Sequence, residues 1–461
     1  MKFSSLSILA PVLFALAACG TNSITELPTR ADPLPDILPP MQVFEPLAQK
    51  ISRRANVDIA RDFLELVFEM ESGKKIDRLS RFDGPITVAL LVDGSARFNA
   101  DLTDLINRMK SEAGLDIRQT ETGQPANIVI ETLPRRKLQA TVPNAACFVV
   151  PRVTSWTDFR KNSRSGALDW TTLETRERAT VFIPNDVSPQ EARDCLHEEI
   201  AQALGPLNDI YRLADSVYND DNINTVLTGF DMLVLKVYYD QQLKNGMSRE
   251  DVATALPAIL ERVNPDGETA PKDGQLPTTR PWIEAIETAL GPRVGQAKRV
   301  INAKRSTAIA RDEGWFDNRL GFSLFALGRL SLGFEAETAT ESFTQAYTVY
   351  SELYGTDDIH TAHVALQLAA FSLSMGDAET ALGFINSSLP AVARAQNAAL
   401  LATFLMIKAE ALDYDGLHEQ AATVRLDSLG WARYGFSSDQ EIRARLREIA
   451  ALRPRKKKPG V

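Results

Sequence analysis

The chain has 461 residues, which is enough for two or three domains of ordinary size. Hydrophobic residues make up 44% and charged residues 24%, a balance typical of globular proteins that excludes a wholly disordered chain. Because the net charge is −9, no overall positive field attracts nucleic acid and we expect no nucleic-acid partner, and three cysteines are too few for a disulfide-rich scaffold.

The first segment, residues 1–19, is predicted to be a secretory signal peptide. Lys2 supplies the positive start, and the apolar run that follows is too short to span a membrane. The run ends in Leu-Ala-Ala-Cys-Gly at 16–20, which resembles a bacterial lipobox. This resemblance implies that Cys19 is lipidated and that the protein is anchored by lipid to the periplasmic face of the outer membrane of a Gram-negative bacterium. The alternative is an ordinary signal peptide with an incidental cysteine.

Residues 20–42 are rich in proline and are predicted to be an extended tether. With Cys19 assigned to the lipid, Cys147 and Cys195 remain. In an oxidising compartment the simplest expectation for such a pair is a disulfide. A free reactive thiol is the alternative.

The region 43–265 mixes predicted helices and strands. Helices are expected at 59–70, 101–113, 189–204, 225–239 and 249–263, and strands at 85–92, 115–117, 128–130 and 180–183. The helix at 189–204 has the clearest start, because Ser188 can cap it, Pro189 suits its first turn and Glu191 would complete a capping box. Gly205 then ends it. This order of elements predicts an α+β domain.

Residues 266–281 contain several glycines and prolines and are predicted to be a linker. Beyond it, residues 282–450 are expected to be wholly helical, and 451–461 form a short basic tail. Alanines at 339, 381 and 421 recur at spacings of 42 and 40, each shortly after a glycine. This pattern resembles long-period tetratricopeptide repeats, which implies paired helices that bind envelope proteins or peptides. An unrelated helical bundle is the alternative.

The helix at 189–204 places an acid in its apolar stripe. On a helical wheel Glu199 falls among the apolar residues, Glu198 and Gln202 lie side by side at the edge of the stripe, and His197 projects away from both. A core-facing carboxylate is costly unless it is paired, hydrogen-bonded or bound to a metal, and its pKa is raised, as a general base requires. The alternative is a buried glutamate that binds neighbouring backbone amides.

Residues 198–208 resemble the metzincin zinc helix H-E-x-x-H-x-x-G-x-x-H. Glu199 stands at the position of the glutamate base and Gly205 at that of the glycine. The three ligand histidines are replaced by residues that offer oxygen: Glu198, Gln202 and Asn208. The resemblance therefore implies a zincin-like domain without its zinc ligands.

Oxygen ligands suit calcium or magnesium better than zinc. Asp209 and the acidic run at 219–222 add further oxygens, although the run lacks the alternating spacing of an EF-hand and is also what a polar turn requires. Aligning the motif so that His197 is its first histidine fails, because Ala201 would then stand at the position of the second histidine ligand.

Over residues 50–265 the chain is similar to a domain-of-unknown-function family of Gram-negative envelope proteins. Short motifs carry this similarity, at 195–199, 202–205, 208–209, 219–221, 230–231, 239–240 and 245–248. The similarity implies an envelope location and a zincin-like domain, and it brings no known activity.

Two functions follow from these observations. The first is a binding or assembly protein of the envelope that needs no cofactor. The second is a metal-dependent hydrolase, in which Glu199 activates a water on a divalent cation held by Glu198, Gln202 and either Asn208 or Asp209, and cleaves peptide or cell-wall bonds. A structural calcium site at Glu198, Gln202 and Asp209 is a third possibility.

Overall fold

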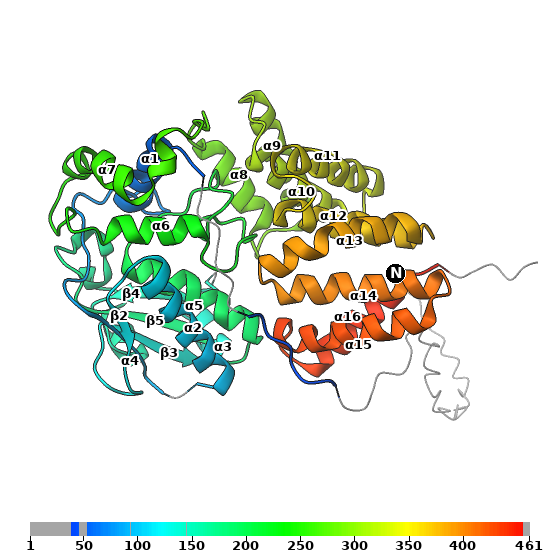
Figure 1. Cartoon of the computed structure of the whole chain (residues 1–461), viewed down its shortest axis with the longest axis horizontal. Coiled ribbons are helices and arrows are strands. Elements are labelled where there is room, and N and C mark those ends of the chain that lie inside the picture. Colours follow the sequence, from blue (N-terminus) through cyan, green and yellow to red (C-terminus); the bar gives the residue numbers. More distant parts are fainter. Residues whose placement is uncertain (1–37, 46–52, 93, 144, 455–461) are drawn as a thin grey trace, which may run out of the picture.

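The computed structural model describes residues 38–45, 53–92, 94–143 and 145–454 (Figure 1). The signal peptide, Cys19, most of the tether and the end of the basic tail lie outside these residues and stay predictions. In the described ranges, no helix combines the length and the apolar character that crossing a membrane requires.

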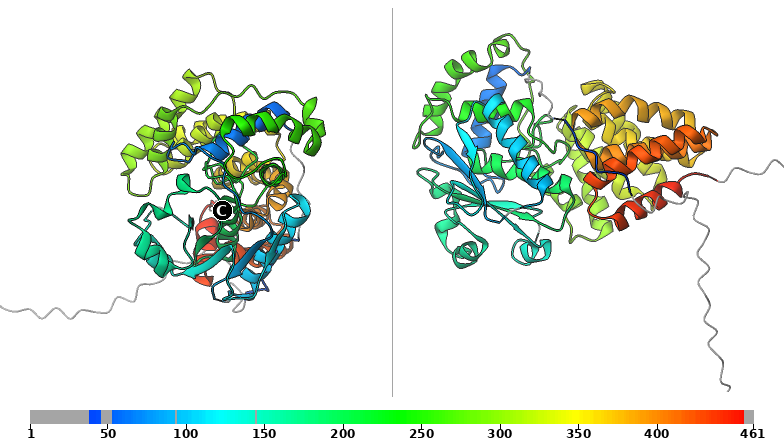
Figure 2. Two further views of the ribbon diagram at one scale, coloured as in Figure 1. Left: turned by 90° about the vertical axis from the view of Figure 1, so that its left-hand side faces the viewer. Right: turned by 60° about the horizontal axis from the view of Figure 1, so that its bottom comes forward.

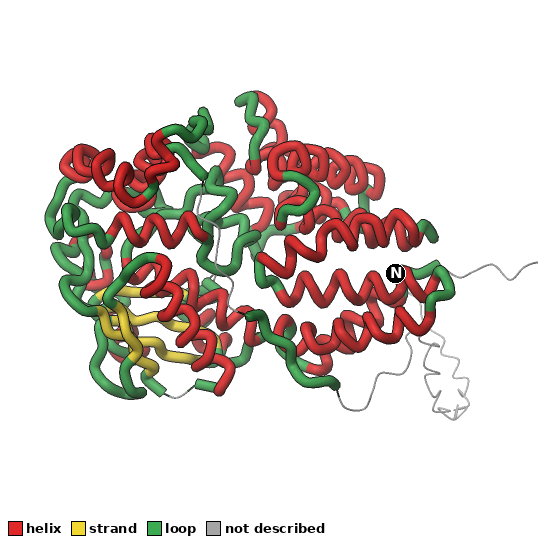
Figure 3. The backbone as a smooth tube through the Cα atoms, viewed as in Figure 1, coloured by secondary structure: helices red, strands yellow, loops and turns green. Residues whose placement is uncertain are grey.

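Five strands form one mixed sheet near the start of the chain (Figure 3). They are β1 (Ile86–Leu90), β2 (Ile117–Gln119), β3 (Ile128–Leu133), β4 (Phe148–Pro151) and β5 (Ala179–Pro184), in the order β2-β1-β3-β5-β4. Only the edge strand β4 is antiparallel to its neighbour, with Val149 opposite Val181. The strands predicted at 85–92, 128–130 and 180–183 are confirmed as β1, β3 and β5. The strand predicted at 115–117 overlaps β2 only at Ile117, and β4 was not predicted.

The helices of this region cover the sheet and extend its core. They are α1 (Asn56–Phe68), α2 (Ala96–Glu112), α3 (Arg135–Gln139), α4 (Trp156–Asn162), α5 (Pro189–Leu204), α6 (Gly229–Tyr238) and α7 (Arg249–Val263), with short 3-10 turns at Gly166–Leu168, Trp170–Thr172 and Pro265–Glu268. The side chains of α1, α2, α5, α6 and α7 share one apolar core with the sheet. The predicted α+β organisation is therefore confirmed.

Side-chain caps set the starts of two helices that differ from the predicted ones. The helix α2 begins earlier than predicted because the Ser95 hydroxyl accepts the Phe98 N–H at 3.2 Å. Likewise α6 begins later, since Thr228 forms a full capping box with Asp231. Ser188 caps α5 as expected, but the capping box is incomplete, because the Glu191 carboxylate pairs with Arg135 instead.

One buried arginine holds the end of α5. The Arg176 guanidinium donates to the carbonyl oxygens of Gln202, Ala203 and Gly205 at 2.8, 2.7 and 2.7 Å, and the residue is 4% exposed. A cation at a helix C-terminus satisfies free carbonyls and interacts favourably with the helix dipole. This contact fixes the end of the helix that carries the candidate site residues.

The second half of the described chain is an array of helices. These are α8 (Arg280–Leu290), α9 (Gln296–Asp312), α10 (Asn318–Ser331), α11 (Ala336–Tyr354), α12 (Ile359–Ser374), α13 (Ala378–Arg394), α14 (Ala398–Tyr414), α15 (His418–Gly435) and α16 (Asp439–Ala450). The predicted all-helical region is confirmed. It lies beside the α+β part and packs against it (Figures 1 and 2).

The repeated alanines mark three successive helical hairpins, α10–α11, α12–α13 and α14–α15. Each is the fourth residue of the second helix of its hairpin and has no exposed surface: Ala339, Ala381 and Ala421. The glycines that precede them adopt φ of +84°, +82° and +85°, a conformation that other residues rarely adopt: Gly333, Gly376 and Gly416. The sequence spacing therefore corresponds to a recurring turn and a recurring close helix contact.

Polar contacts join the two halves of the molecule. The start of α5 meets the start of α14, where Gln190 Nε2 lies 3.1 Å from Asn397 Oδ1. The Tyr434 hydroxyl of α15 donates to Asp101 of α2 at 3.1 Å. The end of the predicted tether also contacts α15, with a 3.0 Å hydrogen bond from the Gln42 N–H to the Gly430 carbonyl.

Replacing Gly435 with alanine is expected to lower the free energy of unfolding by about 1–3 kcal/mol. A Cβ at this last residue of α15 would lie 2.5 Å from the Ala399 backbone nitrogen and 2.6 Å from its Cα, and backbone atoms cannot move aside easily. The matched control is Gly383→Ala inside α13, where nothing lies within 4 Å of the new Cβ. Higher helix propensity should raise the stability of the control variant by up to about 1 kcal/mol, as urea titrations can measure.

Candidate functional site

A cavity of about 300 Å³ opens beside α5. Its wall is formed by α5, by the segment before β4 and by the loop from 205 to 228 that follows α5. The lining residues with charged or amide side chains are Glu191, Asp194, Glu198, Asp209, Asn219, Asp220, Asn222 and Asn224. Sequence alone placed an acidic site near α5, and the structure encloses it on several sides.

Carboxylates crowd together in this cavity. Burial raises the pKa of Glu198 to about 7, and the negative charges of Asp220, Glu71 and Asp194 contribute to this rise. Burial and the Glu71 and Asp220 charges raise the pKa of Asp209 well above its usual value. Glu71 lies at the surface in the turn after α1 and shares a hydrogen bond with Asp209. No pattern in the sequence connected Glu71 with α5.

Glu199 is more deeply buried than the carboxylates that line the cavity. It is 3% exposed, its Oε2 has no hydrogen-bond partner, and burial followed by the charges of Glu198 and Glu71 raises its pKa well above the usual value. One carboxylate oxygen of Glu199, one of Glu198 and the Cys147 sulfur all lie within 4.8 Å of one another. The residue thus faces the interior, as the helical wheel indicates, but it is not part of the cavity wall.

The four predicted ligand residues do not converge on one point. Glu198 and Asp209 both line the cavity, whereas Gln202 and Asn208 do not. Asn208 is directed to α1, where its amide donates to the Glu65 carbonyl at 3.2 Å. The structure therefore brings two of the four predicted ligand residues, Glu198 and Asp209, to the same cavity.

His197 faces away from this site. Its Nδ1 accepts the backbone N–H of Leu227 at 3.1 Å. Burial, with the nearby positive charges of Arg193 and Arg108, lowers the pKa of His197 well below its ordinary value, so the ring is neutral. This histidine supports the loop after α5, in keeping with its direction on the helical wheel.

Residues of the acidic run at 219–222 have two roles, because some of them form a local turn and Asp220 faces the cavity. The Asn219 Oδ1 accepts the Asp221 N–H at 3.1 Å, and Asp221 in turn accepts the Ile223 N–H at 3.0 Å. These bonds are typical of a polar turn. Asp220 instead lines the cavity, and the Tyr211 hydroxyl donates to it at 3.3 Å.

The predicted disulfide between Cys147 and Cys195 is present. It joins the segment directly before β4 to the middle of α5, and both sulfur-bearing residues line the cavity. Because Cys147 is oxidised, it cannot act as a thiolate ligand beside Glu198 and Glu199.

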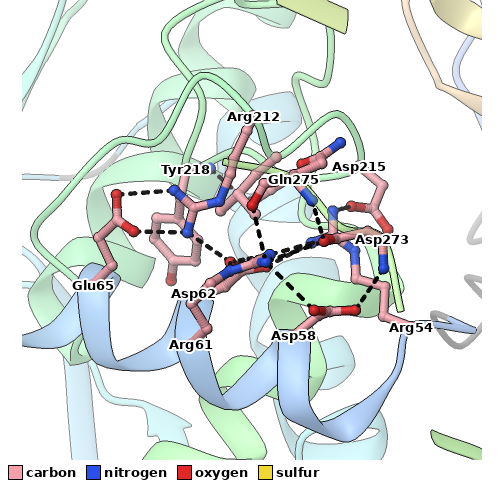
Figure 4. Close-up of polar contacts among 12 residues, drawn as sticks. Arg54, Asp58, Arg61, Asp62, Glu65, Arg212, Asp215, Tyr218, Asp273 and Gln275 are labelled. Atoms are coloured by element: carbon pink, nitrogen blue, oxygen red, sulfur yellow. Dashed lines mark hydrogen bonds and ion pairs between the residues drawn. The ribbon is translucent and has the colours of Figure 1, made fainter. Parts of the chain in front are cut away.

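An ion-pair network anchors the loop after α5 to α1 (Figure 4). Arg212 Nη2 lies 2.6 Å from Asp62 and 2.7 Å from Glu65, and the Arg212 and Asp62 side chains have no exposed surface. Arg54 adds a second contact to Asp62 at 2.9 Å. Arg212 lies between Asp209 and Asp220 in the chain, so this network ties the loop that carries both of them to α1.

The crowded carboxylates predict an unusual pH dependence of stability. A carboxyl group whose pKa is raised by folding stabilises the native state below the unfolded pKa, and this contribution is lost as the pH rises through the folded pKa. For Glu198 the window runs from about 4.5 to about 7. Stability is therefore expected to fall across this window, and Glu198→Gln should make the fall smaller, as thermal unfolding measured in steps of pH would show. An identical pH profile in the variant and the wild type would contradict this.

The comparisons with known proteins give one match. No curated protein and no solved structure matches the chain. A family model described as "Protein of unknown function (DUF2927)" matches residues 56–258, which include all the strands of the sheet, α5 and the cavity loop. The expectation of a domain-of-unknown-function family is thus confirmed for this part of the chain, where residues 56–258 match the DUF2927 family model.

Proposed function

We propose that this protein is a lipid-anchored binding or assembly protein at the periplasmic face of the outer membrane. In this proposal the DUF2927 domain is a zincin-like fold that has lost its zinc ligands, and the helical hairpins are tetratricopeptide-like repeats that bind envelope proteins or peptides. The lipobox at 16–20 supports the location, and the mixed sheet that precedes α5 supports the zincin-like fold.

One observation carries the binding function. Each of the three hairpin turns exposes a large apolar side chain: Phe334 at 77%, Met375 at 81% and Leu417 at 43%. Single exposed apolar residues are ordinary, but these three recur at equivalent turns. Because successive helices alternate in direction, the three turns lie at the same end of the array. We call these three residues the apolar turn row, and a row of this kind suits an apolar or amphipathic protein partner.

The hydrolase alternative draws on Glu199, whose buried carboxylate has one oxygen without a hydrogen-bond partner and one oxygen within 4.8 Å of a Glu198 oxygen. A general base must come within hydrogen-bond reach of the water that it activates. Glu199 does not line the cavity, and the side chain of Asn208 is bound to α1 rather than directed to a shared metal position. The positions of these side chains therefore favour binding over hydrolysis.

The experiment compares three variants that replace the wild-type gene in cells. Phe334→Ser combined with Met375→Ser should reproduce the phenotype of a deletion, because it removes the two most exposed members of the apolar turn row. Leu426→Ser is the matched control, since Leu426 is 54% exposed in the middle of α15. Glu199→Gln keeps the shape of the side chain and should leave the phenotype normal. Loss of function in Glu199→Gln, with normal function in the turn variant, would favour the hydrolase.

A further inference from the structure

The disulfide lies beside two carboxylates of α5. One oxygen of Glu198, one oxygen of Glu199 and the Cys147 sulfur all lie within 4.8 Å of one another, and the described residues form no other such group of potential metal ligands. Cys195 is bonded to Cys147, so its sulfur adjoins the same point. Cys195 also precedes the two glutamates by three and four residues, spacings that place side chains on one face of a helix. Two sulfurs and two carboxylates therefore lie around one position.

Neither of these carboxylates has a positively charged partner among the described residues. The charges that act on Glu198 most strongly are negative, those of Asp220, Glu71 and Asp194, and Glu199 is influenced by Glu198 and Glu71. Glu199 is 3% exposed, and its Oε2 has no hydrogen-bond partner. Buried polar groups without partners are rare, and each requires an explanation. Such carboxylates need either protons or a cation.

Reduction of the disulfide would turn this position into a set of four metal ligands. A dithiol reductant transfers two electrons and two protons to the bond, which gives the Cys147 and Cys195 thiols and the cyclic disulfide of the reductant. Both cysteines line the cavity of about 300 Å³, so a small reductant can reach the bond through it. Two thiolates beside two carboxylates would then repel one another strongly unless a cation binds them.

We propose that the reduced protein binds one zinc ion through the thiolates of Cys147 and Cys195 and the carboxylates of Glu198 and Glu199. Zinc takes four sulfur, nitrogen or carboxylate ligands in a tetrahedron, whereas calcium takes oxygen ligands only. With zinc–sulfur bonds of about 2.3 Å and zinc–oxygen bonds of about 2.1 Å, neighbouring ligand atoms are about 3.6 Å apart. A closing movement of about 1 Å would therefore bring atoms that lie within 4.8 Å of one another into this geometry.

No further reactant is needed once the disulfide is reduced. Zinc binding displaces the protons that the thiols and carboxyl groups carry, and these protons pass to solvent. The zinc site exists only after reduction, and it is independent of the proposed binding function.

The test uses the full chain with Cys19→Ser, so that Cys147 and Cys195 are its only cysteines. The protein is reduced without oxygen by a phosphine, because a dithiol would itself bind zinc, and is titrated with cobalt(II) and then with zinc. Cobalt(II) reports the ligands, since thiolates give it an intense charge-transfer absorption that carboxylates do not. The reduced protein should develop this absorption with a stoichiometry of one, lose it to zinc, and show a Tm that rises with zinc concentration. The oxidised protein should show no such absorption.

Variants that keep both cysteines test the two carboxylates. Glu198→Gln and Glu199→Gln should each weaken zinc binding to the reduced protein at least about tenfold, since partners outside a ligand set are already worth about that much. The matched control is Glu191→Gln, which removes a carboxylate from the same helix and the same cavity wall. Because Glu191 is paired with Arg135 and lies outside the ligand group, this variant should bind zinc like the parent chain.

Three results would overturn the zinc site. The first is a reduced protein that gives no charge-transfer absorption with cobalt(II). The second is a double variant, Glu198→Gln with Glu199→Gln, that binds zinc as tightly as the parent chain, because the cysteines alone would then hold the metal. The third is circular dichroism showing that the zinc-bound reduced chain is unfolded. The Phe334→Ser and Met375→Ser variant should bind zinc normally, so that failure of one proposal does not decide the other.

Discussion

Replacing Asp62 with alanine is expected to lower the free energy of unfolding by about 3–5 kcal/mol. The Asp62 carboxylate accepts hydrogen bonds from Arg212 at 2.6 Å and from Arg54 and Arg61 at 2.9 Å (Figure 4). Its side chain and that of Arg212 have no exposed surface. Removal of the acid would leave the buried guanidinium with Glu65 as its remaining acidic partner, and an incompletely paired buried charge is strongly destabilising.

The control for this change is Asp77→Ala, which removes an exposed carboxylate from the turn region after α1. It should alter the free energy of unfolding by less than about 0.5 kcal/mol. Urea denaturation of both variants measures the difference. If Asp62→Ala were no more destabilising than Asp77→Ala, the network would not anchor the loop that carries Asp209 and Asp220.

The second large predicted effect on stability comes from removing the disulfide. The double variant Cys147→Ser and Cys195→Ser is expected to lose about 2–4 kcal/mol of stability, because the bond closes a loop between residues 48 positions apart and restricts the unfolded chain. The bond also joins the residue directly before the antiparallel edge strand β4 to α5, and β4 and α5 are in contact. Its loss should therefore loosen the wall of the cavity as well.

A reducing agent provides the matching control. It should lower the stability of the wild type by a similar amount and leave the serine variant unchanged, which can be followed by urea denaturation with and without the reductant. Thiol labelling shows whether the bond is reduced. If the wild type with a reduced bond were as stable as the oxidised wild type, the disulfide would not stabilise the fold.

Local signals in the sequence determined much of the secondary structure. The helices at 189–204 and 249–263 have the predicted bounds, because Ser188 and Ser248 accept hydrogen bonds from the backbone N–H groups three residues on. Such caps act within a single turn and can be recognised without a partner elsewhere in the chain. The recurring alanines likewise marked helix contacts between neighbours in the sequence, and the pairing of Cys147 with Cys195 followed from the even number of cysteines left after Cys19.

Only the tertiary structure decided which side chains share the cavity. The direction of Asn208 depends on a carbonyl of α1, and Glu71 reaches Asp209 from the turn after α1. The end of α5 is held by Arg176, which comes from the segment before β5. These contacts join residues far apart in sequence, and a helical wheel reports only the directions of side chains on one helix. The sequence by itself thus determined the helix that carries Glu198 and Glu199, whereas long-range packing decided which of the other acids meet them.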